Sequence, residues 1–145
     1  MSYDMFNSSY YGTSKQTNPH GGTPEWLLNE LSEKYNISSF DPCPNNPKFD
    51  GLSIEWPRGY PIFVNPPYTR GQISKWVKKC HDLWKQGYQI IMLIPSYTDT
   101  AYFHDWIYKK ANIEFIRGRL NFKGYDSKAS FPSMLVFYGV EINES

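Results

Sequence analysis

Residues 61–95 read PIFVNPPYTRGQISKWVKKCHDLWKQGYQIIMLIP, and this stretch predicts the centre of the fold. Residues 61–64 form a short apolar strand, and the Pro-Pro pair at 66–67 ends it because proline lacks the N–H that a sheet needs. A helix over about 70–87 follows, since apolar side chains recur on one helical face. These side chains are Ile73, Trp76, Val77, Cys80, Leu83 and Trp84. A strand is predicted over 88–94, because the continuous apolar run from Ile90 to Ile94 is typical of a buried strand.

The same alternation extends on both sides of this stretch. Thr23-Pro24-Glu25 predicts a helix start with Thr23 as the N-cap, and helical spacing continues to about residue 35. The further predicted elements are a strand over 37–40, a helix from a cap at Asp99 to about 110, and strands over 113–116, 119–123 and 132–138. Strands that alternate with helices predict an α/β fold with a mostly parallel sheet, and the last two strands predict an antiparallel hairpin at its edge.

The length of 145 residues fits one compact domain. A polar stretch without apolar periodicity predicts a flexible arm over 1–22, although its aromatic side chains leave open that it orders over a ligand. We expect the domain to occupy residues 23–140 and a short tail to follow over 141–145. We therefore expect no separate target-recognition domain, and we expect any sequence selectivity to come from short segments.

Composition narrows the function classes. The net charge is +1, from 15 basic and 14 acidic side chains, which argues against binding to nucleic acid by overall charge alone but allows local basic patches. Cys43, Cys80 and three scattered histidines show neither a disulfide framework nor zinc-ligand spacing, so we expect no metal. Without a leader or a long apolar span, we expect a cytoplasmic protein that does not engage a membrane.

The four residues Asn65-Pro66-Pro67-Tyr68 follow the predicted strand directly, at the end where ligands of α/β folds bind. The amino group of adenine is a poor nucleophile, because its lone pair is delocalised into the ring. Asn65 and the Pro66 carbonyl can accept its two hydrogens, and Pro67 then shapes the loop. The Tyr68 ring offers a stacking face for a base turned out of a duplex. The motif predicts amino-group chemistry, and the alternative is a plain turn that ends a strand.

This motif resembles the catalytic motif of amino-group methyltransferases that use S-adenosylmethionine, and the similarity extends over roughly residues 22–139. In chain order it comprises Thr23-Pro24 with Trp26, Asp41-Pro42-Cys43, Asp50-Gly51-Leu52, Trp56, Asn65 to Tyr68, Leu93-Ile94-Pro95, Thr98-Asp99-Thr100, Gly118-Arg119-Leu120 with Phe122, and Pro132-Ser133-Met134. As a set, these segments resemble the phage-type DNA N-6-adenine methyltransferases (Dam-like). The resemblance implies a Rossmann-like domain with a shortened cofactor region, from a phage or prophage and acting in the cytoplasm of a bacterial host.

The resemblance also implies a site for S-adenosylmethionine. Thr23 is similar to the position that holds the cofactor's carboxylate, and a simple N-cap would equally explain a threonine there. Asp41-Pro42-Cys43 is similar to the segment at the methionine end, where Asp41 accepts from the ammonium group. Asp50 is similar to the position that accepts from the cofactor's adenine, and Leu52 can pack on that ring.

Three arginines are the candidates for DNA contact, although each could instead pair with a carboxylate. They are Arg70, beside the motif, and Arg117 and Arg119, before the polar loop over 124–130. We expect the chain to transfer a methyl group from S-adenosylmethionine to N6 of adenine in DNA. Two alternatives stay open: methylation of another amino group, in RNA adenine or a glutamine side chain, and a nucleic-acid- or cofactor-binding module without turnover. The oligomeric state is open as well.

Overall fold

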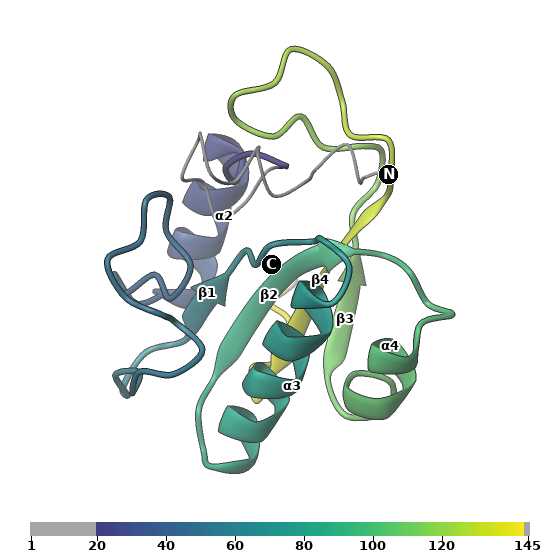
Figure 1. Ribbon diagram of the computed structural model, residues 1–145. Coiled ribbons are helices and arrows are strands. Elements are labelled where there is room, and N and C mark those ends of the chain that lie inside the picture. The colour runs from purple at the N-terminus through teal and green to yellow at the C-terminus, as the bar shows by residue number, and fades with distance from the viewer. Residues whose placement is uncertain (1–19, 144–145) are drawn as a thin grey trace.

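Four strands form one mixed sheet in the computed structural model, which describes residues 20–143 (Figure 1). They are β1 (Ile62–Val64), β2 (Ile90–Pro95), β3 (Asn112–Phe115) and β4 (Ser133–Tyr138), in the order β1-β2-β4-β3 across the sheet. β1 pairs parallel with β2, whereas β4 runs antiparallel to both of its neighbours. The predicted α/β class is correct, but the prediction of a mostly parallel sheet is wrong.

The position of β4 explains the difference. We predicted that 132–138 would pair with 119–123 in a hairpin at the edge, but β4 lies inside the sheet between β2 and β3. Residues 119–123 contribute one isolated bridge, from Lys123 to Gly22. Every residue of β2 and of β4 is buried. Two strands that are apolar on both faces bury the most surface when they pair with each other at the centre of the sheet.

The strand predicted over 37–40 does not form. The Ser38 N–H donates to the Pro61 carbonyl over 2.7 Å, so the segment runs beside the start of β1 and makes one backbone contact there. The prolines at 42 and 44 follow at once, and each lacks the N–H that a ladder needs.

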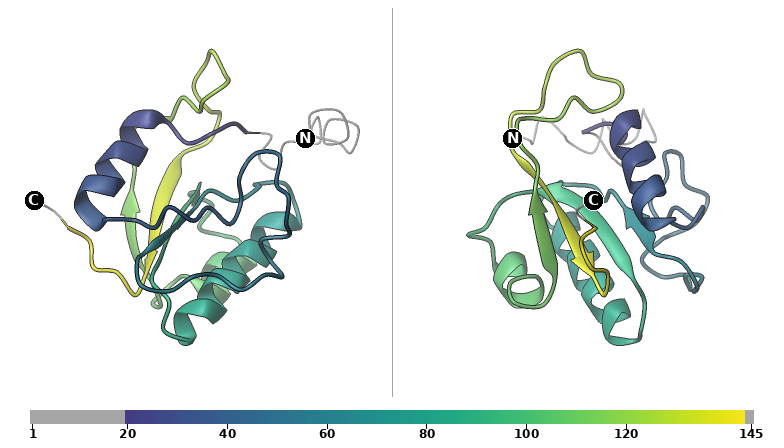
Figure 2. Two further views of the ribbon diagram at one scale, coloured as in Figure 1. Left: turned by 90° about the vertical axis from the view of Figure 1, so that its left-hand side faces the viewer. Right: turned by 180° about the vertical axis from the view of Figure 1, so that it is seen from behind.

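Among the described residues, three helices cover the sheet: α2 (Glu25–Tyr35), α3 (Gln72–Lys85) and α4 (Ala101–Trp106). α3 and α4 lie on one face and α2 on the other (Figure 2). The predicted buried face of α3 is confirmed for five of its six side chains, and the sixth, Trp84, is half-buried. α4 is shorter than predicted and begins one residue later, because Thr100 rather than Asp99 caps it: the Thr100 hydroxyl accepts from the Phe103 N–H over 3.3 Å.

The core consists of two layers that the sheet separates. In β2, Ile90, Met92 and Ile94 belong to the cluster under α3 and α4, whereas Ile91 and Leu93 belong to the cluster under α2. This alternation is what a strand with apolar residues at every position produces when both faces are covered.

The register brings the C-terminal ends of β1, β2 and β3 to one edge of the sheet. β1 and β2 are parallel, and Val64 near the end of β1 pairs with Met92. Ser133 at the start of β4 pairs with Pro95 at the end of β2, and the next residue pairs with Phe115 at the end of β3. The segments that follow β1, β2 and β3 therefore leave the sheet at the same edge.

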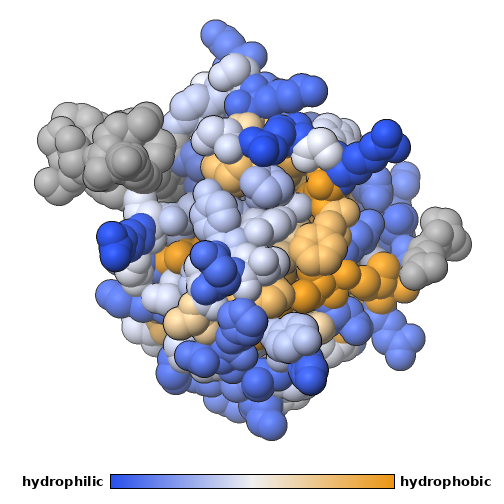
Figure 3. Space-filling view, turned by 90° about the vertical axis from the view of Figure 1, so that its right-hand side faces the viewer, coloured by the Kyte–Doolittle hydropathy of each residue, from blue (hydrophilic) through white to orange (hydrophobic). Residues whose placement is uncertain are grey.

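The surface is mostly polar. Seen from the side of α4 and β3, it carries one band of apolar side chains among charged ones (Figure 3). The exposed large apolar residues include Phe115 of the edge strand β3, at 60% exposure. In the part of the chain that the structure describes, no helix has the length and apolar character needed to cross a membrane.

Candidate active site

Asn65 occupies the first position after β1 and is only 7% exposed. Its Nδ2 donates to the Thr23 hydroxyl oxygen over 2.9 Å. This bond fixes the orientation of the amide, so that Oδ1 faces the side where Tyr68 lies. The two prolines that follow are buried as well, and they restrict the backbone of the loop. The Asn65 oxygen is therefore held in place as a hydrogen-bond acceptor before any ligand arrives.

Tyr68 closes the loop against the neighbouring strand. Its hydroxyl lies 2.9 Å from Asn65 Oδ1 and 2.8 Å from the Leu93 carbonyl of β2. Because a phenol has a single hydrogen, it donates to one of these two oxygens at a time. Burial raises the pKa of Tyr68 well above its ordinary value, so the hydroxyl stays neutral and remains a donor at physiological pH.

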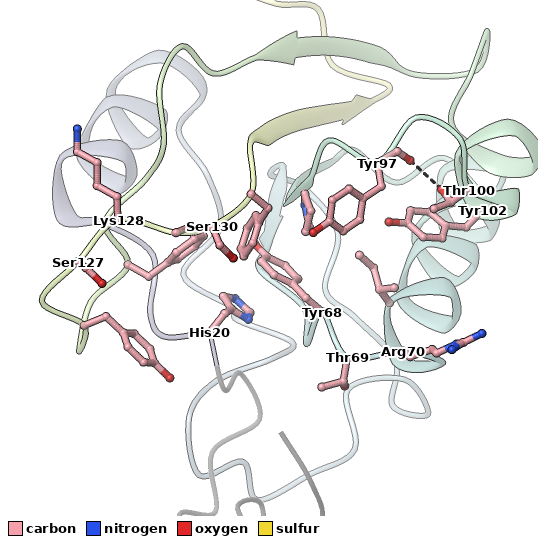
Figure 4. A pocket seen from close by; sticks show the side chains of 16 residues that line it. His20, Tyr68, Thr69, Arg70, Tyr97, Thr100, Tyr102, Ser127, Lys128 and Ser130 are labelled. Atoms are coloured by element: carbon pink, nitrogen blue, oxygen red, sulfur yellow. Dashed lines mark hydrogen bonds between the residues drawn. The ribbon is translucent and has the colours of Figure 1, made fainter. Parts of the chain in front are cut away.

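A cavity of about 780 Å³ opens beside this loop. Tyr68 lies between His20 and the group formed by Tyr97, Thr100 and Tyr102, which come from the segment after β2 (Figure 4). The polar loop over 124–131 supplies the opposite wall, with Ser127, Lys128 and Ser130 among its residues. The cavity has the size and the mixture of aromatic and polar groups that are typical of small-ligand sites.

His20 is the residue of this site that the sequence analysis missed, because it falls within the predicted arm. Its Nε2 lies 2.8 Å from Asn65 Oδ1, and its ring stacks on Tyr68 with 3.6 Å between centroids and 6° between planes. Phe122 meets the same imidazole edge-on at 5.0 Å. Burial lowers the pKa of His20 to about 3, against a weaker opposing effect of the Asn65 bond. No local sequence pattern marks this contact, since the two partners are 45 residues apart.

Thr23 lies in the site but is not the helix cap that we predicted. α2 begins at Glu25 with Pro24 as its N-cap, and the described residues provide no side-chain hydrogen bond for that cap. The Thr23 hydroxyl points instead to Asn65, and the residue is 7% exposed. The first N–H groups of α2 thus remain without the side-chain partner that a Thr cap would provide.

The predicted cofactor residues form two turns that touch each other. The Asp41 carboxylate accepts from the Cys43 N–H over 2.9 Å, and the Asp50 carboxylate accepts from the Leu52 N–H over 3.0 Å. Gly51 joins the turns, since a Cβ added there would lie 1.9 Å from the Pro42 carbonyl oxygen. Only glycine permits such an approach.

Within the two turns, the acidic residues are more exposed than the residues beside them. Asp41 and Asp50 are exposed residues, whereas Pro42 and Cys43 are buried and Leu52 is half-buried. Partial desolvation of its carboxyl group nevertheless raises the pKa of Asp41, and the Cys43 N–H opposes this effect. Burial also raises the pKa of the Cys43 thiol, so this cysteine is a neutral core residue in the same cluster as Val64 of β1.

The three predicted DNA-contacting arginines are all exposed and all follow strands at the same edge of the sheet. Arg70 lines the cavity and its side chain points away from Tyr68 (Figure 4). Arg117 and Arg119 follow β3 and are not part of the cavity lining. The structure thus brings Arg70 to the candidate site and leaves the other two beside it.

Comparison with protein-family models matches residues 12–138 of the chain to DNA N-6-adenine-methyltransferase (Dam). The chain belongs to the Dam family. No curated protein matches it. The expected family is confirmed, and membership indicates a DNA adenine methyltransferase, with S-adenosylmethionine as the implied methyl donor and DNA as the implied substrate. Within residues 20–143 of this Dam-family chain, no three His, Cys, Asp or Glu side chains come together as metal ligands would.

Proposed function

We propose that this chain transfers the methyl group of S-adenosylmethionine to the N6 amino group of adenine in DNA. The observation that carries the proposal is the arrangement of Asn65 and Tyr68, an oriented buried acceptor next to an aromatic ring at the wall of a cavity. Family membership supports the same reaction. We further propose that residues 23–140 form the catalytic domain and that its fold is Rossmann-like, in keeping with a site at the end of the parallel pair.

The proposed chemistry needs acceptors more than it needs a base. Asn65 Oδ1 accepts one amino hydrogen of the target adenine, and the Pro66 carbonyl accepts the other. These bonds would draw electron density onto the nitrogen and expose its lone pair to a methyl donor held beside it. No strong base is needed, because a methylated amino nitrogen loses its extra proton readily to water. The neutral Tyr68 hydroxyl agrees with this chemistry, because a site that works through hydrogen-bond acceptors needs no charged side chain beside the base.

The residues present fit the cofactor. When bound, S-adenosylmethionine supplies an electrophilic methyl group on a sulfonium centre. The N-terminal amides of α2 and the Thr23 hydroxyl suit its carboxylate, because the helix end has no side-chain cap of its own. The exposed carboxylate of Asp41 suits its ammonium group and that of Asp50 suits its adenine amino group, while Leu52 offers an apolar contact for the adenine ring.

DNA contact is proposed to be weak and sensitive to salt. Arg70 stands at the cavity, and Arg117 and Arg119 stand near the same edge, so that few phosphates can be neutralised by a chain of net charge +1. The short loop over 124–131 forms a cavity wall and is therefore the segment best placed to contact bases next to the target.

The variant Asn65→Ala tests the proposal. We expect methylation to fall at least about 100-fold, as for the loss of a transition-state hydrogen bond, while S-adenosylmethionine still binds. Asn112→Ala is a matched control, because Asn112 Nδ2 also donates one hydrogen bond, here to the Val140 carbonyl, but lies in β3. Transfer of a labelled methyl group to DNA, RNA and protein is measured by mass. Undiminished activity of Asn65→Ala would contradict the mechanism. Label found in RNA or in glutamine, and not in DNA, would contradict the proposed substrate.

A further inference from the structure

We propose that His20 occupies the place of the target base in the free protein and must swing out before adenine can enter. This inference rests on the proposed function and adds a regulatory contact within the same site. A segment of the chain itself then closes the active site until a base of the right chemistry displaces it. Three features of the described residues support it.

The first feature is stacking. The His20 and Tyr68 rings are nearly parallel, with 6° between their planes, and their centroids are 3.6 Å apart. This separation corresponds to van der Waals contact between the faces, so no second ring fits between them. Tyr68 is the ring on which the target base is proposed to stack. His20 and a base therefore compete for one face of Tyr68 (Figure 4).

The second feature is the hydrogen bond to Asn65. Oδ1 of the amide can only accept, so His20 Nε2, 2.8 Å away, must carry the hydrogen. An adenine amino group would donate to the same oxygen. A flat ring that stacks on Tyr68 and points one N–H at Asn65 reproduces both interactions that the site is proposed to offer to its substrate.

The third feature is the ease of release. His20 Nδ1 is buried and has no hydrogen-bond partner among the described residues, so the closed position satisfies this ring incompletely. Gly22 anchors the chain through two backbone bonds with Lys123, of 3.1 and 2.8 Å. A single residue, Gly21 with φ of +102°, separates that anchor from His20. Rotation at Gly21 can move the imidazole without disturbing α2 or the sheet, because glycine has access to conformations that other residues lack.

The consequence for binding is quantitative. If the open form makes up a tenth or less of the free protein, the affinity for an adenine that enters the pocket is reduced at least about tenfold. Removal of the imidazole abolishes this penalty. An aromatic ring that stacks but cannot donate keeps the face of Tyr68 covered.

The experiment compares two single-stranded oligodeoxynucleotides, all thymine or with one central adenine, by fluorescence anisotropy. The measured quantity is the ratio of the two dissociation constants. We expect His20→Ala to raise the preference for adenine at least about tenfold over the wild type. His20→Phe should show no gain, and neither should the control His81→Ala, whose imidazole contacts Asp82 on α3.

A second measurement uses the wild-type protein and does not depend on a variant that folds. Diethylpyrocarbonate modifies exposed neutral imidazoles, and peptide mass spectrometry locates the product. We expect His20 to be protected in the free protein and with the thymine oligonucleotide, and to react when the adenine oligonucleotide is bound.

The outcomes separate this inference from the proposed function, because methylation of the same oligonucleotide is followed in parallel. Methylation by the wild type with an unchanged or weakened adenine preference in His20→Ala overturns the inference and leaves the function standing. A weakened preference would make His20 part of the base-binding wall. Neither methylation nor adenine preference in any of the proteins overturns both.

Discussion

The loop that begins at Asn65 and the paired turns over 41–52 both flank β1, yet they are held in opposite ways. The loop over 65–68 is fixed by side-chain bonds to segments 42 and 25 residues away, at Thr23 and Leu93. The turns are fixed by bonds that span two residues, at Asp41 and at Asp50.

This difference separates two kinds of preorganisation. The loop places a buried acceptor that must point in one direction, and long-range contacts with rigid elements provide that precision. The turns present exposed carboxylates at a surface, and local Asx turns are sufficient to shape them. The two turns pack against each other where Gly51 approaches the Pro42 carbonyl. Substitutions in each region and a change of pH test this contrast.

Gly51→Ala should break the paired turns. The added Cβ would lie 1.9 Å from the Pro42 oxygen and 2.8 Å from the Trp76 ring, so backbone must move. We expect a loss of about 3 kcal/mol in unfolding free energy and at least a tenfold loss of S-adenosylmethionine affinity. Thermal unfolding and calorimetric titration measure both effects. Ser53→Ala is the control, since it removes one exposed hydrogen bond of the same turn. Normal affinity in Gly51→Ala would show that the turns do not form the cofactor site.

Acid should weaken the long-range contacts of the loop over 65–68. The pKa of His20 is about 3 when it is buried against Tyr68 and about 6.5 when it is exposed, and Tyr68, the other titratable group in contact, stays neutral. Above pH 6.5 both forms of His20 are neutral. As the pH falls from 7 to 5, only the exposed form gains a proton, so the closed form loses about 2 kcal/mol relative to it.

Thermal unfolding of the wild type and of His20→Ala at pH 7 and pH 5 measures this effect. We expect the wild type to lose up to about 6 °C more than the variant over this range. An equal pH dependence of the two proteins would contradict the burial of a neutral His20.

Tyr68→Phe tests the contribution of a single long-range hydrogen bond to the loop. It retains the ring but removes the hydroxyl that lies between Asn65 Oδ1 and the Leu93 carbonyl. We expect kcat to fall about tenfold, since one net hydrogen bond no longer holds the acceptor. Tyr88→Phe is closely matched, because its hydroxyl also donates to a carbonyl over 2.8 Å, that of Trp56, away from the site. It should cost about 1 kcal/mol of stability with kcat unchanged. Equal kcat losses in both variants would indicate a general packing effect.

Arg70→Ala should produce the smallest change. Arg70 is exposed at the cavity and is proposed to meet a phosphate. We expect DNA affinity to fall a few-fold, and the slope of log K against log salt to decrease by about 0.9, the value for one phosphate contact. Lys34→Ala serves as the control, because Lys34 pairs with Glu30 on α2. A salt slope that does not change would place the DNA elsewhere.

Several elements could be predicted from the sequence because their signals are local. The spacing of its apolar residues indicates the buried face of α3, and the first five of the six predicted side chains are buried. Pro66 and Pro67 indicate the end of β1, because neither has the N–H that a strand ladder needs. The motif Asn65 to Tyr68 was therefore placed correctly at the end of a strand.

The sheet topology was predicted less well for an equally physical reason. β2 and β4 are buried at every position, so neither carries a hydrophobic period that would reveal its direction or partner. Their pairing joins residues 90–95 to 133–138, and no local pattern reports such a contact. The contact of Thr23 could not be predicted for the same reason. Its hydroxyl accepts from Asn65, 42 residues away, and does not cap α2.

Apolar spacing and proline act within a few residues, so the amino-acid sequence alone indicates which segments are buried and which four residues follow β1. The surroundings of Asn65 and Tyr68 depend instead on long-range packing. Thr23 and His20 lie 42 and 45 residues before Asn65, and Leu93 lies 25 residues after Tyr68; the packing of α2 and β2 around β1 brings these segments together. Burial against Tyr68 then makes His20 a neutral occupant of the site, and burial at this depth is a property of the fold that no single residue carries.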